Sequence, residues 1–269
     1  MDFNQAVQKI LDTDELFQTE NVEIRGTYYK AFNKVPTDLK DLLEYGKTVR
    51  EWEEFIVYEK EKISYLEFCD QVSKLSSFLQ KEVGIKKGDK VAVAMRNYPE
   101  YLVILMAVAS IGGILVFVNA WWTTDEMEYG FDDSTARICF ADKERIETIK
   151  PFAKKKNIKL YSVRCPDDPE IEQYDNILKD TKQLDLNNVN LNPDDDFAIM
   201  YTSGSTGHPK GVVLTHRGAI TATFSWLMAE RVGGLLADPE KLARRKPSSV
   251  LLLSPMFHVN GSHPNFFYS

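Results

Sequence analysis

Short apolar segments alternate with longer amphipathic ones over much of the chain. The segments FIVYE at Phe55–Glu59, KVAVAM at Lys90–Met95, RICFA at Arg137–Ala141 and IKLYSV at Ile158–Val163 have the length and composition of strands. Helix-like stretches stand between them. This alternation, over about residues 55–180, is typical of a mostly parallel sheet flanked by helices, so we predict an α/β fold.

Several of the helices are expected to begin at recognisable capping residues. Ser64 with Glu67, and Thr123 with Glu126, have the spacing of a capping box, in which two side chains and two backbone amides bond reciprocally. Asp142 is expected to cap a basic helix in the same region. These signals place helix starts directly after strands, as the α/β prediction requires.

The stretch from Tyr101 to Thr124 contains no charged residue and is long enough to cross a membrane. Gly112-Gly113 divides it where a helix would end, and the following ILVFV resembles a strand. Asn97 as a cap and Pro99 in the first turn predict that a helix starts just before it. We therefore predict a buried helix followed by a buried strand, with a transmembrane helix as the alternative.

The character of the chain changes near residue 181. A polar stretch rich in Asn and Asp is followed by two apolar segments, FAIMY and GVVLTH, a helix over about Arg217–Arg231, and a further apolar segment, SVLLLS, that predicts a buried strand. The expected organisation is an N-terminal segment over 1–50, an α/β lobe over 51–180, a connection over 181–196, and the start of a second lobe over 197–269.

Charge limits the ligands that the protein is expected to bind. The 33 Lys and Arg residues against 40 Asp and Glu give a formal net charge of −7. Nucleic acid is therefore not an expected partner, and an anionic ligand requires a local site.

The cysteines and the N-terminus bear on the compartment. Cys69, Cys139 and Cys165 are far apart and form no CxxC pair, which argues against a disulfide framework and a cysteine zinc site. The N-terminus carries acids where a signal peptide would carry basic residues. We expect an intracellular, cytoplasmic protein, with peripheral membrane or organelle association left open.

The segment YTSGSTGHPKG, Tyr201 to Gly211, contains the residues expected to carry chemistry. Glycines allow backbone N–H groups to surround an anion, hydroxyl groups add donors, and Lys210 adds a mobile positive charge, as a polyphosphate requires. A Walker A loop would need Gly at 209 and Ser or Thr at 211, where this chain has Pro209 and Gly211. The residues that follow are strand-like. The sequence therefore predicts a phosphate loop between two strands; the alternative is a flexible hairpin turn.

This loop resembles the signature T-S-G-[ST]-T-G-x-P-K-G of the class I adenylate-forming enzymes, and it matches every fixed position from Thr202 to Gly211. SPMFHVNG, Ser254 to Gly261, is similar to that family's substrate-pocket segment. The block from Asn97 to Asp142 is similar to the family's upstream block and looks most like fatty acyl-CoA ligases.

The resemblance implies a two-step ligase reaction. A carboxylate, expected to be a fatty acid, attacks the α-phosphate of ATP with Mg²⁺ present, and coenzyme A then displaces AMP from the acyl-adenylate. It also implies which residues bind the phosphates: Thr202, Ser203, Gly204, Ser205, Thr206, Gly207 and Lys210. Of these, Thr202 would also lie near the magnesium ion and Lys210 would act in catalysis.

The resemblance also gives His258 a role beside the substrate carboxylate, where it would act in catalysis. Without the motif, the sequence favours a structural role for His258 as a satisfied histidine at a capped strand end, and the motif reverses that preference. His216 is expected to be structural and His208 to be exposed. The spacing between His258 and His263 does not favour a metal pair on one helix face.

The family's enzymes extend beyond the segments matched here, with a C-terminal domain that carries further nucleotide-binding and catalytic groups. We therefore expect the 269 residues to be the N-terminal part of the large adenylate-forming domain of an acyl-CoA ligase, inactive by itself. The alternative is a non-catalytic nucleotide-binding or interaction module derived from the same half-domain. A transmembrane protein with an unrelated loop is the third interpretation.

Overall fold

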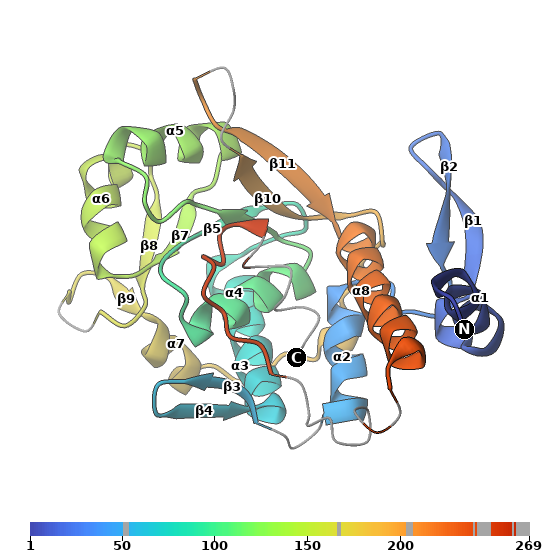
Figure 1. Ribbon diagram of the computed structural model, residues 1–269. Helices are drawn as coiled ribbons and strands as arrows, with labels where there is room; N and C mark the ends of the chain where they lie inside the picture. The colour runs from blue at the N-terminus through green and yellow to red at the C-terminus, as the bar shows by residue number, and fades with distance from the viewer. Residues whose placement is uncertain are drawn as a thin grey trace.

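A seven-stranded sheet is the centre of the molecule in the computed structural model, which describes residues 1–50, 54–165, 168–202, 207–238, 240, 249–259 and 261 (Figure 1). Its strands, in spatial order, are β11 (Lys210–Thr215), β10 (Asp196–Thr202), β6 (Ile114–Phe117), β5 (Lys90–Ala94), β7 (Ile138–Ala141), β8 (Lys159–Ser162) and β9 (Glu172–Gln173). All neighbours are parallel except β10 and β11, which form an antiparallel hairpin. The predicted α/β class with a mostly parallel sheet is confirmed.

Helices cover both faces of this sheet. The described helices are α1 (Phe3–Thr13), α2 (Leu39–Arg50), α3 (Tyr65–Phe78), α4 (Pro99–Ser110), α5 (Thr124–Ser134), α6 (Lys143–Ala153), α7 (Tyr174–Asp180) and α8 (His216–Leu236), with short helical turns at Glu15–Phe17, Leu79–Val83 and Leu186–Asn188. Helix α1 packs against α8 and not on the sheet. The antiparallel pairs β1 (Thr19–Ile24) with β2 (Thr27–Phe32) and β3 (Glu54–Tyr58) with β4 (Glu61–Ser64) form separate small sheets.

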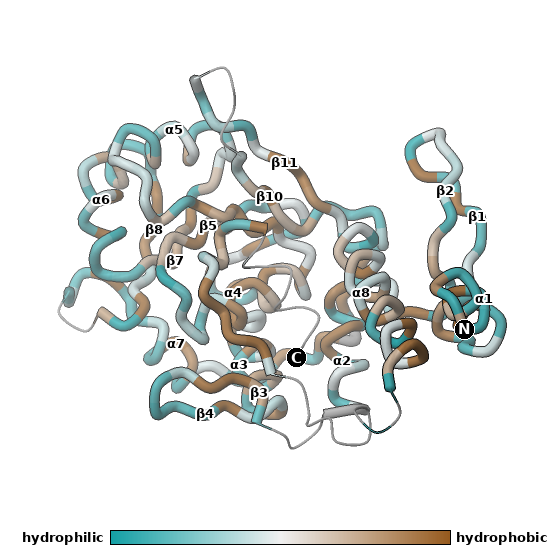
Figure 2. Tube along the Cα trace, in the orientation of Figure 1, coloured by the Kyte–Doolittle hydropathy of each residue, from teal (hydrophilic) through white to brown (hydrophobic). Residues whose placement is uncertain are grey.

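The core lies in two layers, one on each face of the sheet. Along β5, Val91 and Val93 contact the layer that contains α3 and α4, whereas Ala92 and Ala94 contact the layer that contains α5 and α6. All four side chains are fully buried, as expected for a parallel strand covered on both faces. The apolar strands and α4 are brown in Figure 2.

The helix starts were largely predicted correctly. Ser64 and Glu67 form the capping box of α3, and Thr123 and Glu126 form that of α5. The side chain of Asp142 caps α6 by accepting from the amide of Arg145.

The uncharged stretch from Tyr101 to Thr124 divides as predicted. Helix α4 ends at Ser110, Gly112 adopts φ +77°, and β6 follows. Among the described residues, none of the helices combines the length and the apolar character that crossing a membrane requires. One detail of the prediction is wrong: the residue that caps α4 is Tyr98, and the side chain of Asn97 bonds elsewhere.

The apolar segments on either side of the polar connection belong to one sheet. Strand β10, which follows the connection, pairs in parallel with β6 from the earlier part of the chain. The expected connection at 181–196 therefore joins two parts of the chain that contribute strands to one continuous sheet. The division of the chain into domains stays a prediction.

The prediction of a buried strand at SVLLLS is wrong. Residues 249–254 form no strand, and Leu251 and Leu253 are 79% and 81% exposed. A strand requires a neighbouring edge to pair with. Here the carbonyl groups of Leu252 and Ser254 accept hydrogen bonds from the side chain of Asn97 instead.

Candidate functional site

The candidate site lies where the parallel strands end. The carboxyl ends of β5, β6, β7, β8 and β10 share one edge of the sheet because these strands are parallel. After β6 the chain runs to β7, beyond β5, whereas after β10 it turns into β11 on the opposite side. The point where neighbouring connections diverge in this way is where open α/β sheets commonly bind ligands.

The phosphate loop connects β10 to β11 at this edge (Figure 1). Thr202 ends β10 and lies directly opposite Lys210, which begins β11, and the Thr202 hydroxyl donates to the Lys210 carbonyl over 3.4 Å. Both residues are exposed. The predicted residues Ser203, Gly204, Ser205 and Thr206 lie outside the described part of the chain. The structure thus brings together the two residues at the base of the loop.

Glycine is required at two positions of the signature for different structural reasons. Gly207 has φ +95° with open space around it, a conformation that glycine adopts without steric cost. Gly211 lies opposite Tyr201, and a Cβ atom there would come within 2.9 Å of Ile199 Cγ2. The first glycine turns the backbone and the second allows the hairpin strands to pack closely.

Tyr129 of α5 fixes the returning arm of the loop. Its hydroxyl donates to the carbonyl of Pro209 over 3.2 Å, and its ring stacks on His208 with centroids 4.7 Å apart. His208 is exposed, as expected. Tyr129 could not be singled out from the sequence, because a position on a helix surface carries no motif.

Tyr201 anchors the strand beneath the loop. Its hydroxyl donates to Asp133 Oδ2 over 2.7 Å, and its ring packs edge-on against Trp122. Burial, followed by the adjacent Asp133 carboxylate, raises the pKa of Tyr201 above its ordinary value. The phenol therefore stays protonated and keeps donating at neutral pH.

Residues 254–258, here called the His258 segment, contact the loops at the same edge of the sheet. The side chain of Asn97, which follows β5, bonds to the backbone of Ser254 and Met256. Trp121, which follows β6, packs edge-on against Phe257 with centroids 5.2 Å apart and lies 6.4 Å from the His258 ring. His258 is half-buried, and its amide donates to the Pro255 carbonyl.

His216 is structural, as its position between strand and helix suggested. It is fully buried against Phe197, and its Nδ1 accepts the amide hydrogen of Leu39 at the start of α2. Burial lowers the pKa of His216 from 6.5 to about 4, although the nearby Asp195 carboxylate acts in the opposite direction. The imidazole is therefore neutral at physiological pH.

Thr202 and Lys210 are both exposed at the base of the loop, and the positive charge of Lys210 suits binding of phosphate oxygens. Within the described part of the chain, no group of three or more His, Cys, Asp or Glu side chains is arranged to hold a metal ion. His263 of the rejected histidine pair lies outside that part.

The family model described as "AMP-binding enzyme" matches residues 47–268. This match covers most of the chain and includes the signature loop, Asn97 and the His258 segment. The chain belongs to the AMP-binding enzyme family.

Curated relatives of this chain are CoA ligases. It is 30% identical over 187 residues to 4-coumarate–CoA ligase 1 of Petroselinum crispum, covering 69% of this chain and 32% of that protein. It is 29% identical over 206 residues to 2-succinylbenzoate–CoA ligase of Bacillus cereus (strain Q1), covering 77% of this chain and 36% of that one. The chain thus spans about a third of the length of the curated relatives it matches.

Solved structures share the fold. A putative long-chain-fatty-acid CoA ligase from Rhodopseudomonas palustris aligns with a TM-score of 0.71 at 21% identity, over 85% of this chain and 54% of that one. A fatty acyl CoA synthetase of Mycobacterium tuberculosis aligns with a TM-score of 0.66 at 24% identity, over 86% and 42%. At these identities the likeness concerns the fold.

Proposed function

We propose that this chain is part of an AMP-forming acid–thiol ligase, called the full chain below, that uses ATP, a carboxylic acid and coenzyme A. The observation that carries this proposal is the signature loop between β10 and β11, with Thr202 and Lys210 paired at its base. The family match over residues 47–268 supports it.

In the first step, a carboxylate oxygen of the acid attacks the α-phosphorus of ATP. The bond between that phosphorus and the bridging oxygen breaks, and pyrophosphate leaves with the electron pair. In the second step, the thiol sulfur of coenzyme A attacks the acyl carbon, AMP leaves with its electron pair, and the thiol loses its proton.

Each candidate residue has a proposed part in the first step. Lys210 and residues 202–207 would bind the β- and γ-phosphates, where charge develops as pyrophosphate departs. The Thr202 hydroxyl would lie near Mg²⁺, which when bound neutralises part of that charge. His258 would lie beside the substrate carboxylate.

We further propose that the acid is a fatty acid. The resemblance of the block from Asn97 to Asp142 to fatty acyl-CoA ligases supports this choice, whereas the 4-coumarate ligases at 30% identity favour an aryl acid. A competition assay with saturated fatty acids of graded length and with hydroxycinnamic acids separates the two classes by their kcat/KM values.

Substitution of Lys210 tests the ligase proposal directly. In the full chain we expect Lys210→Ala to slow acid-dependent ATP–pyrophosphate exchange by about 100- to 1,000-fold, the cost of losing one preorganised charge-stabilising contact. Thioester formation from pre-formed acyl-adenylate should change much less, because pyrophosphate has already left. Lys62→Ala, on the separate hairpin of β3 and β4, is the control. Equal losses in both half-reactions would contradict the role of Lys210.

The alternative is a nucleotide-binding or interaction module without catalysis, and the ATP–pyrophosphate exchange assay distinguishes it from the ligase. ATP binding without acid-dependent exchange by the full chain would support that alternative and refute the ligase.

A further inference from the structure

The side chain of Asn97 bridges two parts of the chain that are far apart in sequence. Its Nδ2 donates to the Ser254 carbonyl over 2.8 Å and lies 3.4 Å from the Leu252 carbonyl, while its Oδ1 accepts the Met256 amide hydrogen over 2.8 Å. Both the Nδ2 and the Oδ1 of Asn97 therefore form hydrogen bonds to the backbone that directly precedes His258.

Asn97 is not occupied with capping the adjacent helix. The cap of α4 is Tyr98, which makes no side-chain capping bond. An asparagine immediately before a helix usually bonds to that helix. Here its amide bonds instead to residues more than 150 positions away in the chain.

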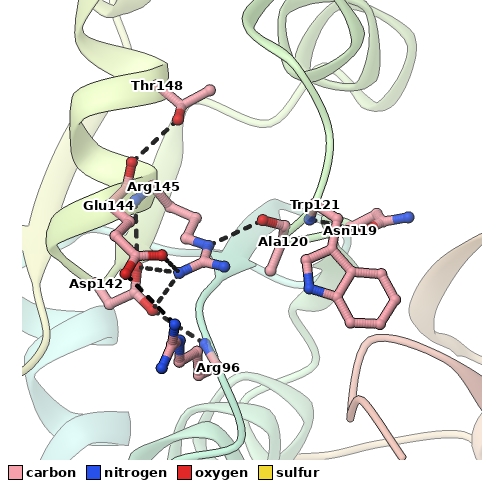
Figure 3. A network of polar contacts seen from close by, with 8 residues as sticks. All are labelled: Arg96, Asn119, Ala120, Trp121, Asp142, Glu144, Arg145 and Thr148. Atoms are coloured by element: carbon pink, nitrogen blue, oxygen red, sulfur yellow. Dashed lines mark hydrogen bonds and ion pairs between the residues drawn. The ribbon is translucent and has the colours of Figure 1, made fainter.

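The loop that carries Asn97 is itself held by a buried ion pair (Figure 3). The Asp142 carboxylate accepts the amide hydrogen of Arg96 over 3.1 Å and pairs with Arg145 at 3.3 Å. Asp142 and Arg145 are only 5% and 6% exposed. Such a pair is strengthened by its low-dielectric surroundings, so it fixes the loop after β5 firmly.

The same ion pair fixes the loop after β6. Arg145 Nε donates to the carbonyl of Ala120 over 2.9 Å, next to Trp121 (Figure 3). Trp121 is the residue that packs against Phe257. The two loops that contact the His258 segment, one through an amide and one through an indole ring, are thus tied to a single buried support.

We propose that Asn97 is a positioning residue for His258. Its amide holds the backbone of residues 254–256 on the loop after β5, and so sets where the imidazole of His258 points at the carboxyl edge of the sheet. The role of His258 toward the substrate carboxylate rests on the proposed function, whereas the contact of Asn97 with the segment does not.

Hydrogen exchange in the full chain tests the contact without relying on activity. Asn97→Asp preserves the shape of the side chain but replaces the donating Nδ2 by an oxygen that faces a carbonyl. We expect amide exchange in a peptide covering residues 252–258 to accelerate about tenfold, with β5 and β6 unchanged. Asn119→Asp is the matched control, because its Oδ1 still accepts the Trp121 amide hydrogen. Unchanged exchange in Asn97→Asp would overturn the proposal.

Kinetics test the consequence for His258. We expect Asn97→Asp to raise KM for the acid about tenfold with KM for ATP little changed, and to add little to the effect of His258→Ala in the double variant, since coupled residues are not additive. Full additivity would overturn the positioning role even if the exchange result holds. Absence of acid-dependent turnover in the unsubstituted full chain would refute the proposed function and leave the exchange result to decide the contact.

Discussion

Burial of His216 should make the stability of the fold sensitive to acid. His216 has a folded-state pKa of about 4, lowered from 6.5 mainly by burial, and its Nδ1 must stay unprotonated to accept from Leu39. Between these two values the unfolded chain takes up a proton that the folded chain does not. The free energy of unfolding should therefore fall as pH drops from 6.5 to 4, by about 3 kcal/mol at most.

Denaturant unfolding at pH 7, 5.5 and 4.5 measures this dependence. The variant His216→Asn offers a neutral acceptor to Leu39 and should show a flatter profile between pH 6.5 and 4. His208→Asn is the control, because His208 is exposed and its variant should retain the slope of the parent. An identical slope in His216→Asn and the parent would show that another group causes the acid sensitivity.

At the scale of elements, an ion pair at the start of α6 holds the neighbouring loops in place. Asp142 caps this helix and also receives the amide of Arg96, while Arg145 reaches across to the loop after β6. One helical turn thus connects the ends of β5, β6 and β7. The sheet edge keeps its shape because this ion pair is buried and bonds to the backbone of both neighbouring loops.

Loss of Arg145 should be costly. Arg145→Ala leaves the Asp142 carboxylate buried without its cation, and we expect the free energy of unfolding to fall by about 3–5 kcal/mol. Lys47→Ala removes the exposed pair of Lys47 with Glu44 and should cost at most about 1 kcal/mol. Urea denaturation of both variants at neutral pH gives the comparison. Similar losses would mean that burial of the Asp142–Arg145 pair has little energetic weight.

At the scale of the whole molecule, apolar side chains remain on the surface of the 269 residues. Val212 and Val213 of β11, Trp226 of α8, and Leu251 and Leu253 are between 44% and 81% exposed. The tube of residues 250–253 is brown in Figure 2. Exposed apolar patches of this kind promote association.

We therefore expect the isolated 269-residue chain to self-associate. Light scattering over a concentration series should show a rising mean mass, and the double variant Leu251→Ser/Leu253→Ser should reduce it. Leu66→Ser, at a separate exposed position on α3, serves as the control. A monodisperse monomer at all concentrations would contradict the expectation.

Local patterns were sufficient for much of the fold. Capping boxes at Ser64 and Thr123 fixed helix starts because their bonds form between residues three apart. The glycines within the uncharged stretch separated helix from strand for the same reason. The segment SVLLLS was misjudged because apolar character alone does not supply a strand with a pairing edge.

The sequence by itself determined the class of the protein, since the signature loop and the strand–helix alternation are contiguous in the chain. Tertiary structure alone decided what Asn97 does. Its local pattern predicts a helix cap, but its side chain bonds to the backbone of Ser254 and Met256. It also decided that β10 joins β6 in one sheet, and that Tyr129 holds the loop. These contacts join residues distant in sequence, and only the packing of the parallel strands, which collects their carboxyl ends at one edge, brings such residues within hydrogen-bonding distance.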